Sequence, residues 1–119
     1  MSEVRITVRL DFTGGRQFGH GKMRLLELID QQGSISSAAR TMKMSYRRAW
    51  LLMDDVNSMF SEPVLEKQLG GKGGGHAKVT DFGRKLVALY RAVEADAQSN
   101  FGGEMDVLAG SLSAKKERQ

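Results

Sequence analysis

Residues 33–60 constrain the fold most, because they carry the periodicity of two helices separated by only a few residues. From Ile35 to Met42, apolar residues recur at i, i+3, i+4 and i+7, which predicts a short helix with one apolar side. Ser34 and Ser45 are good N-cap residues, since a serine hydroxyl accepts a hydrogen bond from the free N–H groups of a first helical turn. The sequence therefore predicts two helices joined by a tight turn.

The second of these helices begins with three residues that its apolar side leaves outside: Tyr46, Arg47 and Arg48. Its apolar positions recur at helical spacing, at Ala49, Leu52, Met53, Val56, Met59 and Phe60. This pattern is typical of a helix-turn-helix whose second helix presents a basic, aromatic leading edge to DNA. An ordinary pair of antiparallel helices with solvated arginines has the same pattern, so the stretch alone leaves both interpretations open.

The net charge of +4 is concentrated in the middle of the chain. Residues 14–80 hold ten Lys and Arg against six Asp and Glu, whereas the two flanking parts are balanced. A segregated positive field favours a polyanionic partner. At 119 residues without cysteine, we expect one domain with no disulfide and no thiolate metal site. No apolar run is long enough to span a membrane and no signal-peptide pattern is present, so we expect a cytoplasmic protein without membrane contact.

Alternation with period two predicts a half-buried strand over residues 3–12, whose ladder needs a partner from this chain or from a second subunit. A helix is expected over residues 20–32, ended by Gly33. Two more short strands are expected at 64–69 and 76–80, on either side of a glycine-rich run. Such a hairpin after a helix-turn-helix is the wing of a winged helix. The expected fold is mainly α with a small β-hairpin, a winged helix-turn-helix with an N-terminal strand and a long C-terminal dimerisation helix.

The last expected helix runs from Asp81 to about Asn100, with Thr80 as its N-cap. Its apolar residues have a spacing close to that of a coiled coil: Phe82, Leu86, Leu89, Tyr90, Val93 and Ala97. One small domain cannot easily bury so long a stripe, so we expect a second copy to cover part of it. Residues 102–119 have weak patterning and predict a flexible tail, which leaves residues 1–101 as the DNA-binding and dimerisation domain.

No catalytic constellation is recognisable. Both histidines, His20 and His76, lie beside glycines and lack a second ligand at helical spacing. The glycine-rich run 70–75 is followed by a strand and lacks the Lys-Ser or Lys-Thr of a phosphate-binding loop, so we expect neither an enzyme nor a bound cofactor or metal. Lys72 in this run suits a contact with a DNA phosphate, although a floppy surface loop has the same composition. Trp50 either packs under the hairpin or reaches DNA.

Taken together, these motifs resemble the N-terminal domain of the ModE-type, molybdate-responsive transcriptional regulators of bacteria, a winged helix related to the LysR-type DNA-binding domain. The resemblance covers roughly residues 3–100 and rests on residues 33–57, the glycine-rich run, Val79-Thr80 and residues 82–92. It implies a homodimer, with the second helix of the motif in the major groove of a palindromic DNA operator and the wing against the backbone.

The predicted site residues fall into two groups, and the resemblance itself assigns Ser45, Tyr46, Arg47, Arg48 and Lys72 among the DNA contacts. The predicted contacts with double-stranded DNA are Ser34, Ser36, Ser45, Tyr46, Arg47, Arg48, Lys72 and Lys78. The predicted dimer contacts come from the first and last helices and are Leu25, Leu86, Leu89, Tyr90, Val93 and Ala97.

Two departures from the ModE pattern affect these expectations. Lys43-Met44 occupies the turn where a glycine is usual, so the chain must either take a positive φ there at some cost or turn in another way. Residues 102–119 are too few for the molybdate-binding domain, so we do not expect this chain to bind molybdate. The function expected is sequence-specific DNA binding by a homodimeric transcriptional regulator. The alternative is a winged-helix protein-interaction module that has lost base-specific DNA reading.

Overall fold

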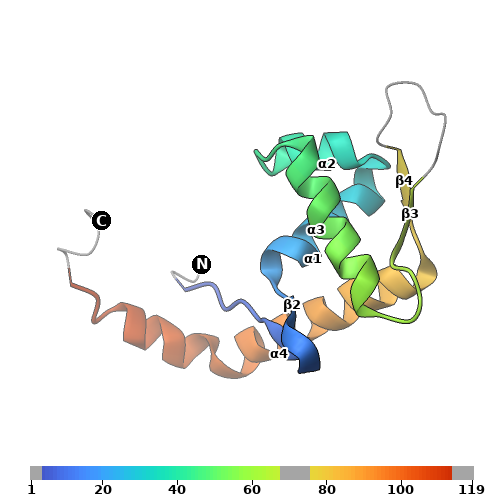
Figure 1. Ribbon diagram of the computed structural model, residues 1–119. Helices are drawn as coiled ribbons and strands as arrows, with labels where there is room; N and C mark the ends of the chain where they lie inside the picture. Colours follow the sequence, from blue (N-terminus) through green and yellow to red (C-terminus); the bar gives the residue numbers. More distant parts are fainter. Residues whose placement is uncertain (1–3, 68–75, 114–119) are drawn as a thin grey trace.

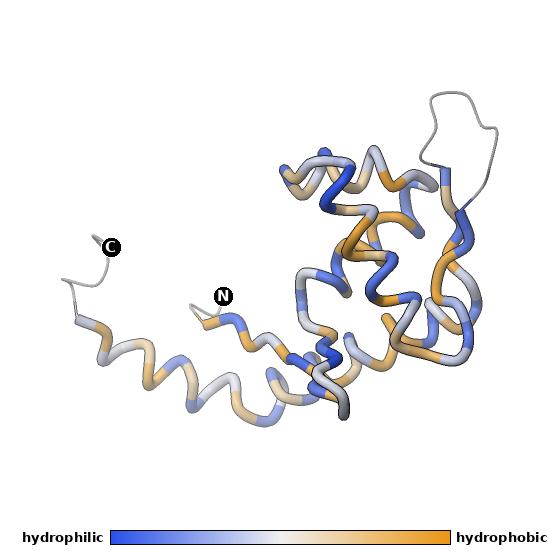
Figure 2. Tube along the Cα trace, in the orientation of Figure 1, coloured by the Kyte–Doolittle hydropathy of each residue, from blue (hydrophilic) through white to orange (hydrophobic). Residues whose placement is uncertain are grey.

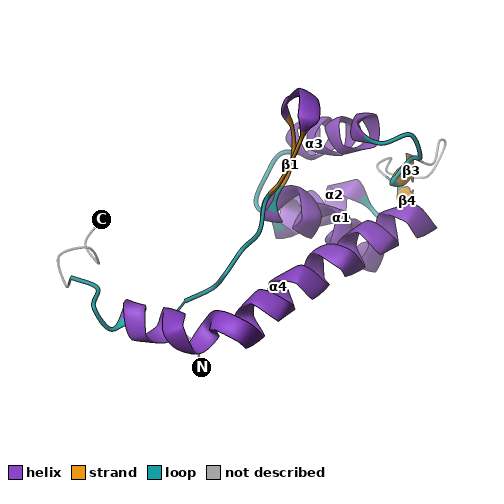
Figure 3. Cartoon of the chain, turned by 90° about the horizontal axis from the view of Figure 1, so that it is seen from below, coloured by secondary structure: helices purple, strands orange, loops and turns teal. Residues whose placement is uncertain are grey.

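Four helices dominate the part of the chain that the computed structural model describes, residues 4–67 and 76–113 (Figure 1). Their bounds are His20–Gln32 (α1), Ile35–Thr41 (α2), Tyr46–Met59 (α3) and Asp81–Ala109 (α4). Helices α1 to α3 pack together, and α4 crosses beside them before it extends away (Figures 1 and 3). Two short antiparallel hairpins complete these residues, so the expectation of a mainly α fold with a small β part is confirmed.

Local capping sets the bounds of the first three helices. The Ser34 hydroxyl accepts from the Ser37 N–H and the Ser45 hydroxyl accepts from the Arg48 N–H, each at 3.1 Å, so both predicted N-caps are confirmed. Gly33 ends α1 with φ 73°, a conformation that a residue with a side chain adopts only at a cost. The helices bury the apolar sides that the sequence predicts, at Leu25, Leu26, Leu28, Ile29, Ile35, Ala38, Ala39, Ala49, Met53 and Val56.

The turn between α2 and α3 takes the first of the two courses that the sequence allows. Lys43 adopts φ 58°, and among the described residues it is the one residue other than glycine with a positive φ. Its N–H donates to the Arg40 carbonyl at 3.1 Å, and the Met44 N–H donates to the Ala39 carbonyl at 3.0 Å. These bonds hold a residue in a conformation that is unfavourable for a side chain.

The N-terminal strand is shorter than predicted. Strand β1 (Leu10–Phe12) pairs with β2 (Arg16–Phe18) around a short 3₁₀ turn (η1, Thr13–Gly15), so its partner belongs to the same chain. Residues 4–9 are not in a ladder, because β2 is too short to reach them. Their alternation nevertheless persists in the burial pattern, in which Val4, Ile6 and Val8 are half-buried and the residues between them are exposed.

The two strands predicted around the glycine-rich run are confirmed. Strand β3 (Leu65–Lys67) pairs antiparallel with β4 (Ala77–Val79). Ser34 forms a β-bridge with His76, and the Ala77 N–H donates to the Gly33 carbonyl at 3.4 Å, so β4 also contacts the start of α2. Residues 68–75, and with them Lys72, lie outside the described residues.

Helix α4 is longer than the sequence predicts. Its N-cap is the expected one, since the Thr80 hydroxyl accepts from the Gly83 N–H at 3.0 Å. Instead of ending near Asn100, it continues to Ala109 and has 29 residues, a length of about 43 Å at 1.5 Å per residue. Gly102 and Gly103 lower helix propensity but do not adopt the left-handed conformation that ends a helix. Residues 102–109, which were expected to belong to the tail, are therefore part of α4.

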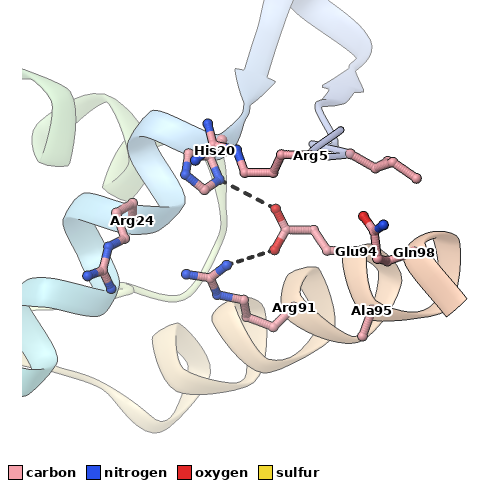
Figure 4. Close-up of a pocket in the computed structure, with 8 residues that line it drawn as sticks. Arg5, His20, Arg24, Arg91, Glu94, Ala95 and Gln98 are labelled. Atoms are coloured by element: carbon pink, nitrogen blue, oxygen red, sulfur yellow. Dashed lines mark hydrogen bonds and ion pairs between the residues drawn. The ribbon is translucent and has the colours of Figure 1, made fainter. Parts of the chain in front are cut away.

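An ion-pair network joins α4 to α1. Arg91 donates to the Glu27 carboxylate at 2.6 Å. It also donates to Glu94 at 2.9 Å, and Glu94 lies 3.4 Å from the His20 ring (Figure 4). The hydrogen bond from Arg91, reinforced by one from Arg24, holds the pKa of Glu27 below its ordinary value despite partial burial. These contacts fix the first half of α4 on the helical core.

Candidate nucleic-acid interface

The first turn of α3 presents its polar side chains to solvent. Tyr46, Arg47 and Arg48 are all exposed, and 45% of Tyr46 is accessible. Within the described chain, neither arginine side chain has a hydrogen-bond or ion-pair partner. Both guanidinium groups therefore keep all their donors available for a ligand.

A shallow hollow of about 340 Å³ runs beside these arginines. On its far side Lys22 of α1 donates to the Asp55 carboxylate at 2.6 Å and to the Gln17 carbonyl at 2.8 Å. The hollow is thus bordered by three cations and one carboxylate, and it has the net positive charge that a phosphate group requires. Its lining residues are Lys22, Ser45, Arg47, Arg48, Leu51, Leu52 and Asp55.

Contacts with the β3–β4 hairpin set the orientation of α3. The Asn57 side chain accepts from the N–H groups of Val64 and Leu65 at 2.8 and 3.1 Å and donates to the Leu65 carbonyl at 2.9 Å. The Lys67 ammonium group lies 3.5 Å from the centre of the Trp50 ring, a cation–π contact. Of the two positions considered for Trp50, packing under the hairpin is the one observed.

The other predicted DNA contacts lie at a different place. Ser34 and Ser36 belong to the start of α2, next to β4 and at the opposite end of this helix from Ser45 (Figure 1). The Ser34 hydroxyl already serves as an N-cap, and Ser36 is half-buried. Lys78 is exposed on β4, opposite Glu66 in the ladder. The structure thus gathers Ser45 to Arg48 on one edge and sets the remaining described residues along α2 and the hairpin.

Two of the six residues predicted as dimer contacts are buried within the single chain. Leu25 and Tyr90 are 0% and 1% exposed, because both pack inside the chain's own core. They present no surface to a partner. Leu86 and Ala97 are half-buried, whereas Leu89 and Val93 are 65% and 43% exposed and remain available.

The predicted site residues do not include Leu51 and Asn57, which lie on the same helix as the basic edge formed by Ser45 to Arg48. Leu51 is 49% exposed and lies one turn after Arg47, a spacing of four residues that the sequence already contains. No sequence pattern predicts the contacts of Asn57, because its partners come from a segment that folds back beside α3. In residues 4–67 and 76–113, three histidine or acidic side chains never gather closely enough to hold a metal ion. The described helices include none with the length and apolar character needed to cross a membrane.

The fold and this edge define a small, mainly α protein built around two helices joined by a tight turn. No protein-family model matches the chain. It is 40% identical over 101 residues, 83% of its length, to the molybdenum transport protein ModE of Azotobacter vinelandii, and 35% identical over 80 residues to the DNA-binding transcriptional dual regulator ModE of Escherichia coli K12. It is also 35% identical over 108 residues to the molybdenum-pterin-binding protein MopA of Rhodobacter capsulatus.

The chain is therefore related to ModE-type proteins over most of its own length. It spans only part of these relatives, 37% of the Azotobacter protein, 39% of MopA and 30% of the Escherichia coli regulator. The resemblance stated from the motifs is confirmed.

Proposed function

We propose that this chain is the DNA-binding part of a transcriptional regulator and acts as a homodimer. Helix α3 enters the major groove, and the β3–β4 hairpin, the wing of a winged helix, lies against the DNA backbone. The observation that carries the proposal is the pair of unpartnered arginines on the exposed first turn of α3. Arginine is suited to this role because its planar fork binds the O6 and N7 atoms of guanine. The relationship to proteins named as transcriptional regulators supports the same conclusion.

The homodimer is supported by the apolar face of α4. This face packs on the core in its first half, through Leu86 and Tyr90, and continues past the point where the core ends. There Phe101 is 54% exposed and Leu108 is 64% exposed. Figure 2 shows apolar positions recurring along this extension of α4. A second α4 covers this face and sets two α3 helices on one side of the dimer, which implies a palindromic operator with half-sites about 34 Å or a multiple apart.

Binding to a labelled duplex is expected to weaken steeply as the salt concentration rises, because lysine and arginine release counterions from phosphates.

Replacing Arg47 or Arg48 with alanine is expected to weaken the binding free energy by about 1–3 kcal/mol and to relax the preference at one base position. Lys72→Ala is expected to weaken all sequences equally and to flatten the salt slope. Fluorescence anisotropy measures each effect, with Lys85→Ala, an exposed lysine of α4, as the control.

The outcomes separate the two functions considered. If neither arginine variant differs from the Lys85→Ala control on any duplex, the basic edge of α3 does not read DNA. The interaction module without base-specific reading would then be the better account. If Lys72→Ala changes the preferred sequence, the assignment of the hairpin to the backbone is wrong.

A further inference from the structure

We propose that residues 4–8 form a β-strand with the same residues of a second copy, in an antiparallel ribbon centred on Ile6. The inference rests on the homodimer proposed above and adds a second contact between copies to that of α4. It starts from a segment that the sequence predicts as a strand and that the chain itself does not complete.

One edge of this segment is occupied. The Val8 N–H donates to the Tyr90 hydroxyl oxygen at 3.3 Å, and the Tyr90 hydroxyl in turn donates to the Val8 carbonyl. Leu10, two residues further on, lies opposite Phe18 in the β1–β2 ladder. Residues two apart in a strand direct their N–H and C=O groups to the same edge. The Tyr90 hydroxyl therefore takes the place of the next rung of this ladder.

The opposite edge is open. Arg5, Thr7 and Arg9 direct their backbone groups away from Tyr90, since successive residues of a strand face opposite edges. In residues 4–67 and 76–113, the backbone of these three residues has no hydrogen-bond partner. An extended segment with free donors and acceptors on one edge is a template for another strand.

The position of the segment joins this edge to the proposed dimer contact. Arg5 and Ile6 line a pocket with Ala95 and Gln98 of α4, and Figure 4 shows Arg5 across this pocket from Glu94. The segment therefore lies over the part of α4 just before its apolar face leaves the core. In the homodimer proposed above, the α4 helix of the second copy carries a second such segment with the same open edge. The occupant of the open edge is accordingly a second copy of this chain.

Charge disfavours one register of the ribbon. Pairing centred on Thr7 would set Arg5 opposite Arg9 of the other copy, and like charges directly opposite each other are destabilising. Pairing centred on Val8 would set Arg5 opposite Asp11, an opposite-charge pair, but Arg5 would then share this carboxylate with Arg9, which already binds it within its own chain at 2.9 Å. Pairing centred on Ile6 sets Arg5 opposite Thr7 and brings two half-buried isoleucines face to face. Facing residues of this kind are about 4.5 Å apart between Cα atoms, within the range of a disulfide.

Single cysteines test this register directly, because the chain has no cysteine of its own. The full chain with Ile6→Cys, oxidised under mild conditions, is expected to run almost entirely as a covalent dimer on a non-reducing gel. Thr7→Cys and Val8→Cys are the matched controls, and both are expected to remain mostly monomeric on the same gel, because they lie away from the axis.

A second variant tests the ribbon without a thiol. Thr7→Pro removes an N–H from the open edge. We expect it to raise the dissociation constant of the dimer roughly thirtyfold relative to Thr7→Ala, since two symmetric hydrogen bonds, about 2 kcal/mol in total, are lost. Both variants are expected to keep the helical circular dichroism signal of the wild-type chain. Analytical ultracentrifugation measures the dissociation constants.

The outcomes distinguish this inference from the proposed homodimer. A wild-type dimer with no Ile6→Cys cross-link and no effect of Thr7→Pro would overturn the ribbon and leave the α4 contact standing. Preferential cross-linking of Thr7→Cys or Val8→Cys would overturn the register. A wild-type chain that is monomeric at all concentrations would overturn both the ribbon and the homodimer.

Discussion

Replacing Gly83 with alanine is expected to lower the free energy of unfolding by about 3 kcal/mol, the upper part of the range for overpacking a close-packed site. Gly83 lies in the first turn of α4, where that helix crosses β3 and β4. A Cβ atom there would stand 2.3 Å from the Val64 carbonyl oxygen and 2.8 Å from a methyl group of Val79. The carbonyl oxygen belongs to the backbone and accepts from the Thr80 N–H at 3.0 Å, so it cannot simply turn aside.

Gly103 provides the control, because it lies in the same helix and a Cβ atom there meets nothing within 4 Å. Gly103→Ala is expected to raise the free energy of unfolding by up to about 1 kcal/mol through helix propensity. Urea unfolding followed by circular dichroism measures both variants. Equal stability of the two would mean that α4 does not approach the hairpin as closely as described.

The second large effect concerns association. The double variant Val93→Glu, Phe101→Glu is expected to raise the dissociation constant of the homodimer by at least about a hundredfold, because each glutamate would be buried without a partner in the paired helices. Both side chains are exposed in the isolated chain, at 43% and 54%, so the fold itself is expected to remain intact. Light scattering gives the mass, and helical circular dichroism reports on folding.

Ser99→Glu is the matched control, an exposed position of α4 on the side of the helix away from Phe101. This variant is expected to keep the wild-type mass. If the double variant also remains dimeric, the copies associate through another surface. If it loses its helical signal, Val93 and Phe101 belong to the core of a single chain and the contact between α4 helices is wrong.

Features set by neighbouring residues were predictable from the sequence. The N-caps at Ser34, Ser45 and Thr80 and the end of α1 at Gly33 depend on atoms within one turn, and all four are confirmed. The exposure of Arg47 follows in the same way from the period of α3.

Features that depend on distant residues were not predictable. Tyr90 has the spacing of an exposed interface residue, but its hydroxyl bonds to Val8, 82 residues away, and its ring packs on Phe18. Burial raises the pKa of Tyr90, in keeping with this position in the core. The predicted strand over residues 3–12 gained only a three-residue partner, because strand length depends on a pairing that local alternation does not contain.

We assign sequence-specific DNA binding to the basic edge of α3, acting in a two-fold dimer. Repeated selection of bound duplexes from a random pool, sequenced after each round, tests this claim most directly. Wild-type protein is expected to enrich an inverted repeat with half-sites about one or more helical turns apart, and the chain with Arg47→Ala and Arg48→Ala is expected to lose that enrichment. Failure of wild-type protein to enrich any sequence at low salt would contradict the account.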